Sequence, residues 1–244
     1  MKTSHITPRN PIFCALDTQD RDQATSWAAR LTDSIGGIKL GLEFFNANGP
    51  KGVADVARAC ALPLFLDLKL HDIPNTVAGA TKAIVNHLTP YMINVHAAGG
   101  GAMMTAAAKA AADTAAARGI IRPLVIGVTI LTSLNDQDVA EIGMSGTASD
   151  QVRRLAALAQ KSGLDGVVCS PHEAAMLRQD LGPDFKLITP GVRPHWASAN
   201  DQKRVMTPGE AIAQGADYVV IGRPITHAED QAAAAKRIVT ELAA

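Results

Sequence analysis

Eight short apolar segments recur along the sequence, and segments of helical character separate them. The apolar segments have the length of strands and are rich in Val, Ile and Leu, as strands buried on both faces are. Strands that alternate with helices predict a parallel sheet covered by helices. Eight such units within 244 residues favour closure into a single (β/α)8 TIM barrel. We expect the strands at residues 12–17, 37–43, 63–70, 91–97, 123–131, 166–170, 186–190 and 218–222.

An open doubly wound sheet is the alternative fold. It is less favoured because no GxGxxG turn follows the first expected strand, where such sheets bind dinucleotide phosphates. We expect one barrel domain over residues 1–244, with an N-terminal extension over about residues 1–10. The polar stretch 192–207 follows the seventh expected strand and is long enough to form a lid loop over a ligand.

The third expected strand carries charge where a buried strand should be apolar. Side chains alternate between the two faces of a strand, so four leucines share one face and Asp67 and Lys69 share the other. Burying an ion costs on the order of several kcal/mol unless it is paired. This pair therefore indicates a functional site, and Asp72 follows just past the strand.

Polar residues also stand at or near the ends of other expected strands. In a barrel these carboxyl ends meet at one mouth, where the active site lies. Two lysines and two carboxylates would converge there, and each charge favours the ionised form of its neighbour. Asp17 and His96 end their expected strands, and Lys39 lies within the second one. Thr132, Arg193 and Arg223 follow the fifth, seventh and eighth strands.

The loops after the seventh and eighth strands have the character of a phosphate site. They contain Pro190, Arg193, Gly222 and Arg223, and barrel enzymes often bind phosphate on these two loops. An arginine can grip phosphate oxygens with two hydrogen bonds. Read alone, the Gly-Arg-Pro sequence is only a turn.

Several of these residues have a structural alternative. Asp17 and Asp72 each precede a helix and could serve only as helix caps. Lys39 could extend along the strand edge to solvent. His71 and His96 are expected to be hydrogen-bonded structural residues rather than catalysts.

The composition disfavours two classes of partner. Lys+Arg and Asp+Glu number 23 each, and aromatic residues make up 4%, so neither nucleic acid nor an anionic membrane is favoured as a partner. No apolar run reaches membrane-spanning length. The three cysteines lack zinc-ligand spacing and are expected to be reduced core residues of a cytoplasmic protein.

The segment 67–76, DLKLHDIPNT, resembles the signature of bacterial orotidine 5′-phosphate decarboxylases. The resemblance extends over nearly the whole chain. It implies a barrel enzyme that converts orotidine 5′-monophosphate to uridine 5′-monophosphate and CO₂, the last step of de novo pyrimidine synthesis, without a cofactor or metal ion. The segments that agree are Asp17, GIK at 37–39, LTS at 131–133, PGVR at 190–193, DQKR at 201–204, TP at 207–208 and IGRPI at 221–225.

The resemblance also implies roles for individual residues. Lys69 would protonate C6 of the pyrimidine, and Asp67 would lie beside the departing carboxylate. Asp72, Ile73 and Thr76 would enter the site of a partner subunit, which implies a homodimer. The implied catalytic residues are Lys69, Asp67, Asp72 and Lys39. The implied substrate-binding residues are Asp17, Lys39, Asp67, Ile73, Thr76, Thr132, Pro190, Arg193, Gln202, Gly222 and Arg223.

Two alternative functions remain at the level of sequence. Magnesium-dependent sugar-phosphate decarboxylases or aldolases of the same superfamily share the Asp-x-Lys-x-x-Asp motif at 67–72, but they place an acidic metal ligand where this chain has Lys39. A non-catalytic barrel that binds a phosphorylated ligand is the other alternative. Such a binding protein has no need of alternating charges inside its barrel.

Overall fold

The described part of the chain, residues 7–197 and 206–242 of a computed structural model, forms a closed barrel of eight parallel strands. Each strand pairs with its neighbours in sequence, and β1 pairs with β8 to close the ring. The predicted (β/α)8 fold is confirmed. The strands are β1 (Ile12–Ala15), β2 (Gly37–Gly41), β3 (Leu64–Leu70), β4 (Met92–His96), β5 (Leu124–Val128), β6 (Gly166–Val168), β7 (Lys186–Pro190) and β8 (Tyr218–Ile221).

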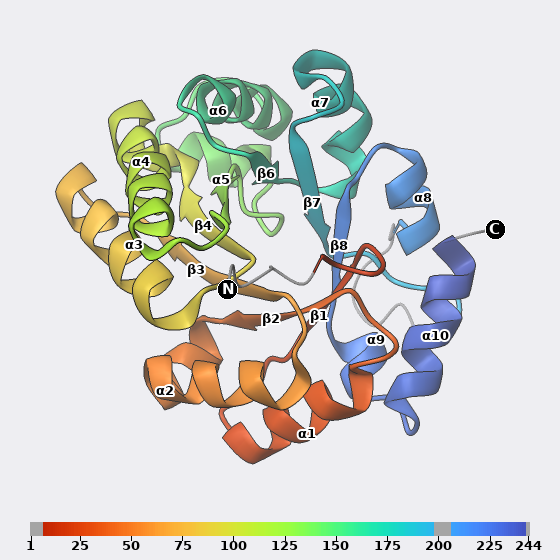
Figure 1. The fold of residues 1–244 in the computed structure, drawn as a ribbon. Coiled ribbons are helices and arrows are strands. Elements are labelled where there is room, and N and C mark those ends of the chain that lie inside the picture. The colour runs from red at the N-terminus through yellow and green to blue at the C-terminus, as the bar shows by residue number, and fades with distance from the viewer. Residues whose placement is uncertain (1–6, 198–205, 243–244) are drawn as a thin grey trace.

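The helices form an outer layer around the ring of strands, and the chain passes once around the barrel in sequence order (Figure 1). The last helix packs beside the first, which joins the two ends of the circuit. The helices are α1 (Arg21–Leu31), α2 (Leu42–Cys60), α3 (Pro74–Leu88), α4 (Gly101–Arg118), α5 (Asp136–Glu141), α6 (Ala148–Lys161), α7 (Ala174–Leu181), α8 (Pro208–Ala213), α9 (Arg223–Thr226) and α10 (Gln231–Leu242).

Four strands end two or three residues earlier than the sequence predicts. They are β1, which ends at Ala15, β2 at Gly41, β5 at Val128 and β6 at Val168. After β5, apolar character continues past the strand because the following residues still line buried space, as Ile130 does with 7% of its surface exposed. The polar residues after β1, β5 and β6 therefore lie in loops, where their side chains can reach a ligand.

Side chains fill the part of the barrel interior that lies near the amino ends of the strands. Phe13, Phe65 and Met92 are buried inside the ring. Near the amino ends of the strands, the hydroxyls of Tyr91 and Tyr218 lie 2.7 Å apart, and Phe13 packs edge-on against Tyr218. A second and larger apolar core lies between the strands and the helices. In the part of the chain that the structure describes, this packing closes the amino ends of the strands and leaves the carboxyl ends open to a ligand.

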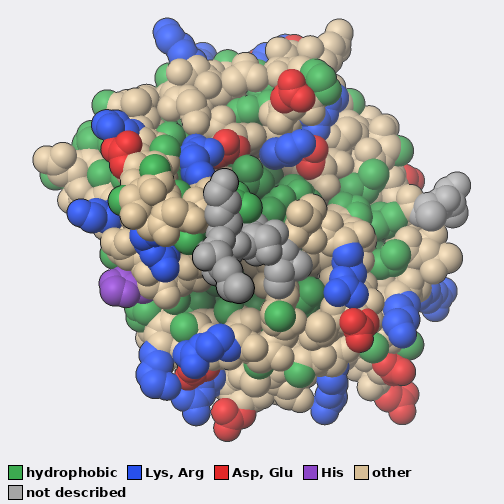
Figure 2. Space-filling view, in the orientation of Figure 1, with side chains coloured by type: hydrophobic (Ala, Val, Ile, Leu, Met, Phe, Trp, Pro, Cys, Tyr) green, Lys and Arg blue, Asp and Glu red, His purple; other side chains and the backbone are tan. Residues whose placement is uncertain are grey.

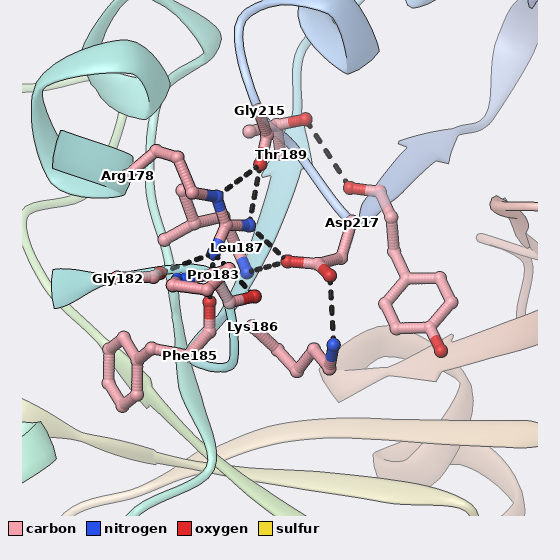
Figure 3. Close-up of polar contacts among 10 residues, drawn as sticks. Arg178, Gly182, Pro183, Phe185, Lys186, Leu187, Thr189, Gly215 and Asp217 are labelled. Carbon is pink, nitrogen blue, oxygen red and sulfur yellow. Dashed lines mark hydrogen bonds and ion pairs between the residues drawn. The ribbon is translucent and has the colours of Figure 1, made fainter.

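An arginine fastens the amino ends of β7 and β8 to the end of α7 (Figure 3). Arg178 donates to the carbonyl oxygens of Gly182, Phe185 and Gly215, and to the carboxylate of Asp217. The same carboxylate accepts from the backbone N–H of Leu187 at 2.9 Å. The Arg178–Asp217 ion pair thus satisfies backbone groups on β7 and on the connections that lead into β7 and β8.

Replacing Asp217 by alanine is expected to lower the free energy of unfolding by about 3 kcal/mol, because it leaves the partly buried guanidinium of Arg178 without its counter-charge. Urea denaturation measures the change. The control is Asp180→Ala, which removes the ion-pair partner of Arg153. Asp180 is more exposed than Asp217, so the free energy of unfolding should fall by less than about 1 kcal/mol. Equal losses in the two variants would contradict the assigned role of Asp217.

The face drawn in Figure 2 carries no large basic or acidic patch, because Lys and Arg are interspersed with Asp and Glu. This agrees with the balanced charge of the whole sequence. Within residues 7–197 and 206–242, no helix combines the length and apolar character needed to cross a membrane. The three cysteines are buried free thiols, as predicted, and burial raises the pKa of Cys14 and Cys169.

Candidate active site

A cavity of about 400 Å³ opens at the carboxyl ends of the strands. Hydrophobic side chains from β3, β6, β7 and β8 form much of its wall, and polar side chains gather on its rim and on one side. The structure brings most of the predicted site residues together here. Those that line the cavity are Asp17, Lys39, Asp67, Lys69, Thr132, Pro190, Arg193, Gly222 and Arg223.

Four charged side chains form a chain of alternating sign along one side of the cavity. The ammonium of Lys39 lies 2.9 Å from Oδ1 of Asp17 and 3.5 Å from Oδ2 of Asp67. The ammonium of Lys69 lies 2.7 Å from Oδ1 of Asp67. Asp67 is thus held between two lysines, and each charge has an opposite charge beside it.

Lys39 is buried in the middle of β2, with 8% of its surface exposed. Its side chain extends along the barrel interior to the layer of Asp67, so the alternative in which it leaves the strand edge for solvent is wrong. Gly41 makes room for this path, because a Cβ there would lie 2.9 Å from the lysine Nζ. The sequence carries no local signal for this role of Gly41.

The surroundings of Asp67 hold its carboxyl group ionised. Burial by itself would raise the pKa of this group, but the charges of Lys39 and Lys69 and hydrogen bonds from Lys69 and Asn94 together lower it below its ordinary value. A carboxylate and an ammonium therefore face each other at a partly buried position in the cavity wall. Electrostatic interactions are stronger in such a place than in bulk solvent.

The described residues predicted to bind phosphate lie on the side of the cavity formed by β7, β8 and the loops that follow them. Pro190 ends β7, and Arg193 follows it at the cavity wall. Gly222 precedes α9, and Arg223 is the first residue of that short helix. Gln202 lies outside the described residues, as do residues 198–205 of the expected lid loop and residues 1–6 of the expected N-terminal extension.

Three predicted site residues do not line the cavity of their own chain. Asp72, Ile73 and Thr76 lie at the start of α3 and are exposed, and Ile73 exposes 66% of its surface although it is apolar.

Asp72 does not cap α3, because the N-cap residue is Ile73 and the Asp72 carboxylate accepts only from the adjacent Ile73 N–H. Asp17 is no cap either, since Asp20 caps α1. The capping alternative is therefore wrong at both positions.

Asn94 is a site residue that the sequence analysis missed. It lies on β4 with 1% of its surface exposed and donates from Nδ2 to Oδ1 of Asp67 at 2.7 Å. The available signal was a polar residue that alternates with apolar ones along this strand.

His96, also on β4, stacks on His71. Burial lowers the pKa of His96, and the nearby His71 and Lys69 lower it further.

The described residues contain no group of three or more His, Cys, Asp or Glu side chains arranged to hold a metal ion. The carboxylates of Asp17 and Asp67 are the acidic groups of the cavity, and the ammonium of Lys39 lies between them. A divalent cation bound to both would meet this positive charge. The residues of the site therefore do not fit the magnesium alternative.

Comparisons with known proteins give a consistent result. The family model described as "Orotidine 5'-phosphate decarboxylase / HUMPS family" matches residues 10–238. An orotidine 5'-phosphate decarboxylase of Rhodospirillum rubrum is 61% identical over 96% of this chain and 94% of its own length. That of Paramagnetospirillum magneticum is 53% identical over 96% of this chain and 98% of its own. A crystal structure of the Lactobacillus acidophilus enzyme is 35% identical, with a TM-score of 0.83 over 96% of this chain and all of the other.

Proposed function

The chain belongs to the orotidine 5′-phosphate decarboxylase family, and we propose here how its residues carry out that reaction. The protein converts orotidine 5′-monophosphate to uridine 5′-monophosphate and CO₂ in pyrimidine biosynthesis. The observation that carries the proposed mechanism is the Asp67–Lys69 ion pair at the wall of the cavity.

Lys69 acts on C6 of the pyrimidine. When the bond between C6 and the carboxylate breaks, its electron pair stays on C6, and no neighbouring ring position delocalises it easily. A fixed ammonium stabilises the charge as it develops. The same ammonium then delivers a proton to C6, and Lys69 takes up a proton from solvent to complete the cycle.

Asp67 lies beside the carboxylate that leaves. Its pKa is held low, so it is an anion when the substrate carboxylate arrives. Repulsion between the two carboxylates relaxes as neutral CO₂ departs. Asp67 also orients Lys69, because its Oδ1 accepts a hydrogen bond from the lysine at 2.7 Å.

The remaining cavity residues bind the parts of the substrate that do not react. Asp17 and Lys39 take the ribose hydroxyls, and Thr132 contacts the pyrimidine edge. Phosphate binds to Gln202, Arg193 and the loop of Gly222 and Arg223, beside Pro190. Binding energy from this distant phosphate serves to order the charges around C6.

The loop at 192–207 covers the bound phosphate in this proposal. Two described contacts support it. Val192 and Arg193 line the cavity at one end of the segment, and the backbone N–H of Arg193 donates to the carbonyl oxygen of Met206 at 3.1 Å. The two ends of the segment are therefore joined at the cavity.

A homodimer completes each site. Asp72, Ile73 and Thr76 are exposed at the start of α3 and lie outside their own cavity, which fits a role in the cavity of a second subunit. The exposed Ile73 side chain would be buried by such an interface. We place this dimer in the cytoplasm, where its three unpaired thiols would stay reduced.

The reaction is expected to need no divalent metal ion. We expect full activity on orotidine 5′-monophosphate in excess EDTA, measured by the loss of the substrate's ultraviolet absorbance. The physical reason is that Lys39 supplies the positive charge between Asp17 and Asp67. Absent turnover, or turnover restored only by Mg²⁺, would favour the magnesium-dependent alternative.

A further inference from the structure

β3 departs from regular strand geometry at the point where it carries the reacting groups. Leu66 pairs with Ile93 and Leu70 pairs with Val95, so three residues of β3 stand opposite the single residue Asn94 of β4. Within this bulge Lys69 has a φ of 51°. A lysine adopts this left-handed conformation at an energetic cost, so the surroundings must hold it there.

The side chain of Asn94 fills the gap that the bulge opens. Its Oδ1 accepts from the backbone N–H of Lys69 at 2.8 Å, and its Nδ2 donates to Oδ1 of Asp67 at 2.7 Å. Only this orientation of the amide satisfies both partners, since the reverse would set N–H against N–H and oxygen against oxygen. One buried side chain thus binds the backbone of the lysine and the carboxylate of the aspartate.

These contacts determine where the two charged groups point. The left-handed backbone sets the direction of the Lys69 side chain, and its ammonium meets Oδ1 of Asp67 at 2.7 Å. Asn94 donates to that same oxygen, so the carboxylate cannot rotate without breaking two hydrogen bonds. Both ends of the Asp67–Lys69 pair depend on Asn94.

We infer that Asn94 is a positioning residue for the decarboxylation: it holds the strained backbone of Lys69 and the carboxylate of Asp67 in the geometry that proton transfer to C6 requires. This inference rests on the proposed roles of those two residues. Asn94 itself does not line the cavity and acts through them.

The test is Asn94→Leu, which keeps the number and branching of the side-chain heavy atoms and removes both hydrogen bonds. We expect kcat per active site to fall about 100-fold, the effect of displacing a reacting group by about 1 Å. The dissociation constant for uridine 5′-monophosphate should change less than about threefold, because β4 lies across the barrel from β8 and its phosphate loop. Counting sites by this ligand also removes unfolded chains from the comparison.

Asn94→Asp is a second variant with the same shape. It keeps an acceptor for the Lys69 N–H but loses the donor to Asp67 and sets two carboxylates against each other. We expect kcat to fall at least as far as in Asn94→Leu, again with little change in uridine 5′-monophosphate binding. The isosteric side chain keeps the test available if leucine does not fit the site.

The matched control is Thr129→Val. Thr129 is fully buried and donates to the carbonyl oxygen of Val168 at 2.9 Å, but neither Asp67 nor Lys69 is among its hydrogen-bond partners. Losing this hydrogen bond should lower the free energy of unfolding and leave kcat within about threefold of the native value. If both Asn94 variants also stay within that limit while the native protein is active, the inference is overturned. A native protein without turnover would instead refute the proposed function.

Discussion

Replacing Lys69 by alanine is expected to lower kcat on orotidine 5′-monophosphate by about 10⁴-fold or more. The variant loses both the charge that stabilises the C6 carbanion and the proton that quenches it. A positioned general acid contributes about 10²- to 10⁴-fold, and one electrostatic donor contributes about 10²- to 10³-fold. Single-turnover decay of the substrate's ultraviolet absorbance measures the loss.

Two controls separate lost chemistry from lost structure. Lys109→Ala removes an exposed lysine of α4, paired only with Asp113 along the same helix, and should leave kcat unchanged. The Lys69 variant should still bind uridine 5′-monophosphate, since the proposed phosphate contacts remain in place. A Lys69→Ala enzyme within about tenfold of native kcat would remove Lys69 from the mechanism.

Mixing inactive Lys69→Ala chains with inactive Asp72→Ala chains is expected to restore about a quarter of the native activity. Random exchange of a two-fold symmetric dimer makes half of the dimers mixed. In each mixed dimer one cavity receives a native Lys69 from one chain and a native Asp72 from the other. Activity appears without any new contact, because intact residues from two damaged chains meet in one site.

The measurement needs proof that subunits exchange. Chains labelled with two different fluorophores report exchange by energy transfer, and activity is followed over the same period. A mixture of Lys69→Ala with Asp67→Ala is the matched control, because both residues belong to one chain's cavity and exchange cannot reunite them. Demonstrated exchange without recovery in the Lys69 and Asp72 mixture would show that the sites are not shared.

The barrel and its charged mouth were predictable from sequence for local reasons. Strand and helix periods do not depend on distant contacts, so eight buried strands and their order were readable directly. Alternation along β3 placed Asp67 and Lys69 on the inner face, and both line the cavity. Strand ends were less accurate, since apolar character continues past β5 into a loop that still lines buried space.

Competing local roles were not separable from sequence. Asp17 and Asp72 stand where helix caps commonly stand, and a capping residue is recognised only by the backbone N–H groups that it accepts from. In the structure Asp20 caps α1 and Ile73 occupies the N-cap position of α3. This outcome frees Asp17 to pair with Lys39.

The sequence by itself determined the barrel fold, the inward face of β3 and the residues that its mouth would gather. Only the tertiary structure decided how those residues are held. Lys69 leaves the regular strand conformation, and the side chain of Asn94, 25 residues further along the chain, binds its backbone. That contact exists because β3 and β4 pair with a bulge, and pairing between strands is a property of the closed barrel that no local pattern contains.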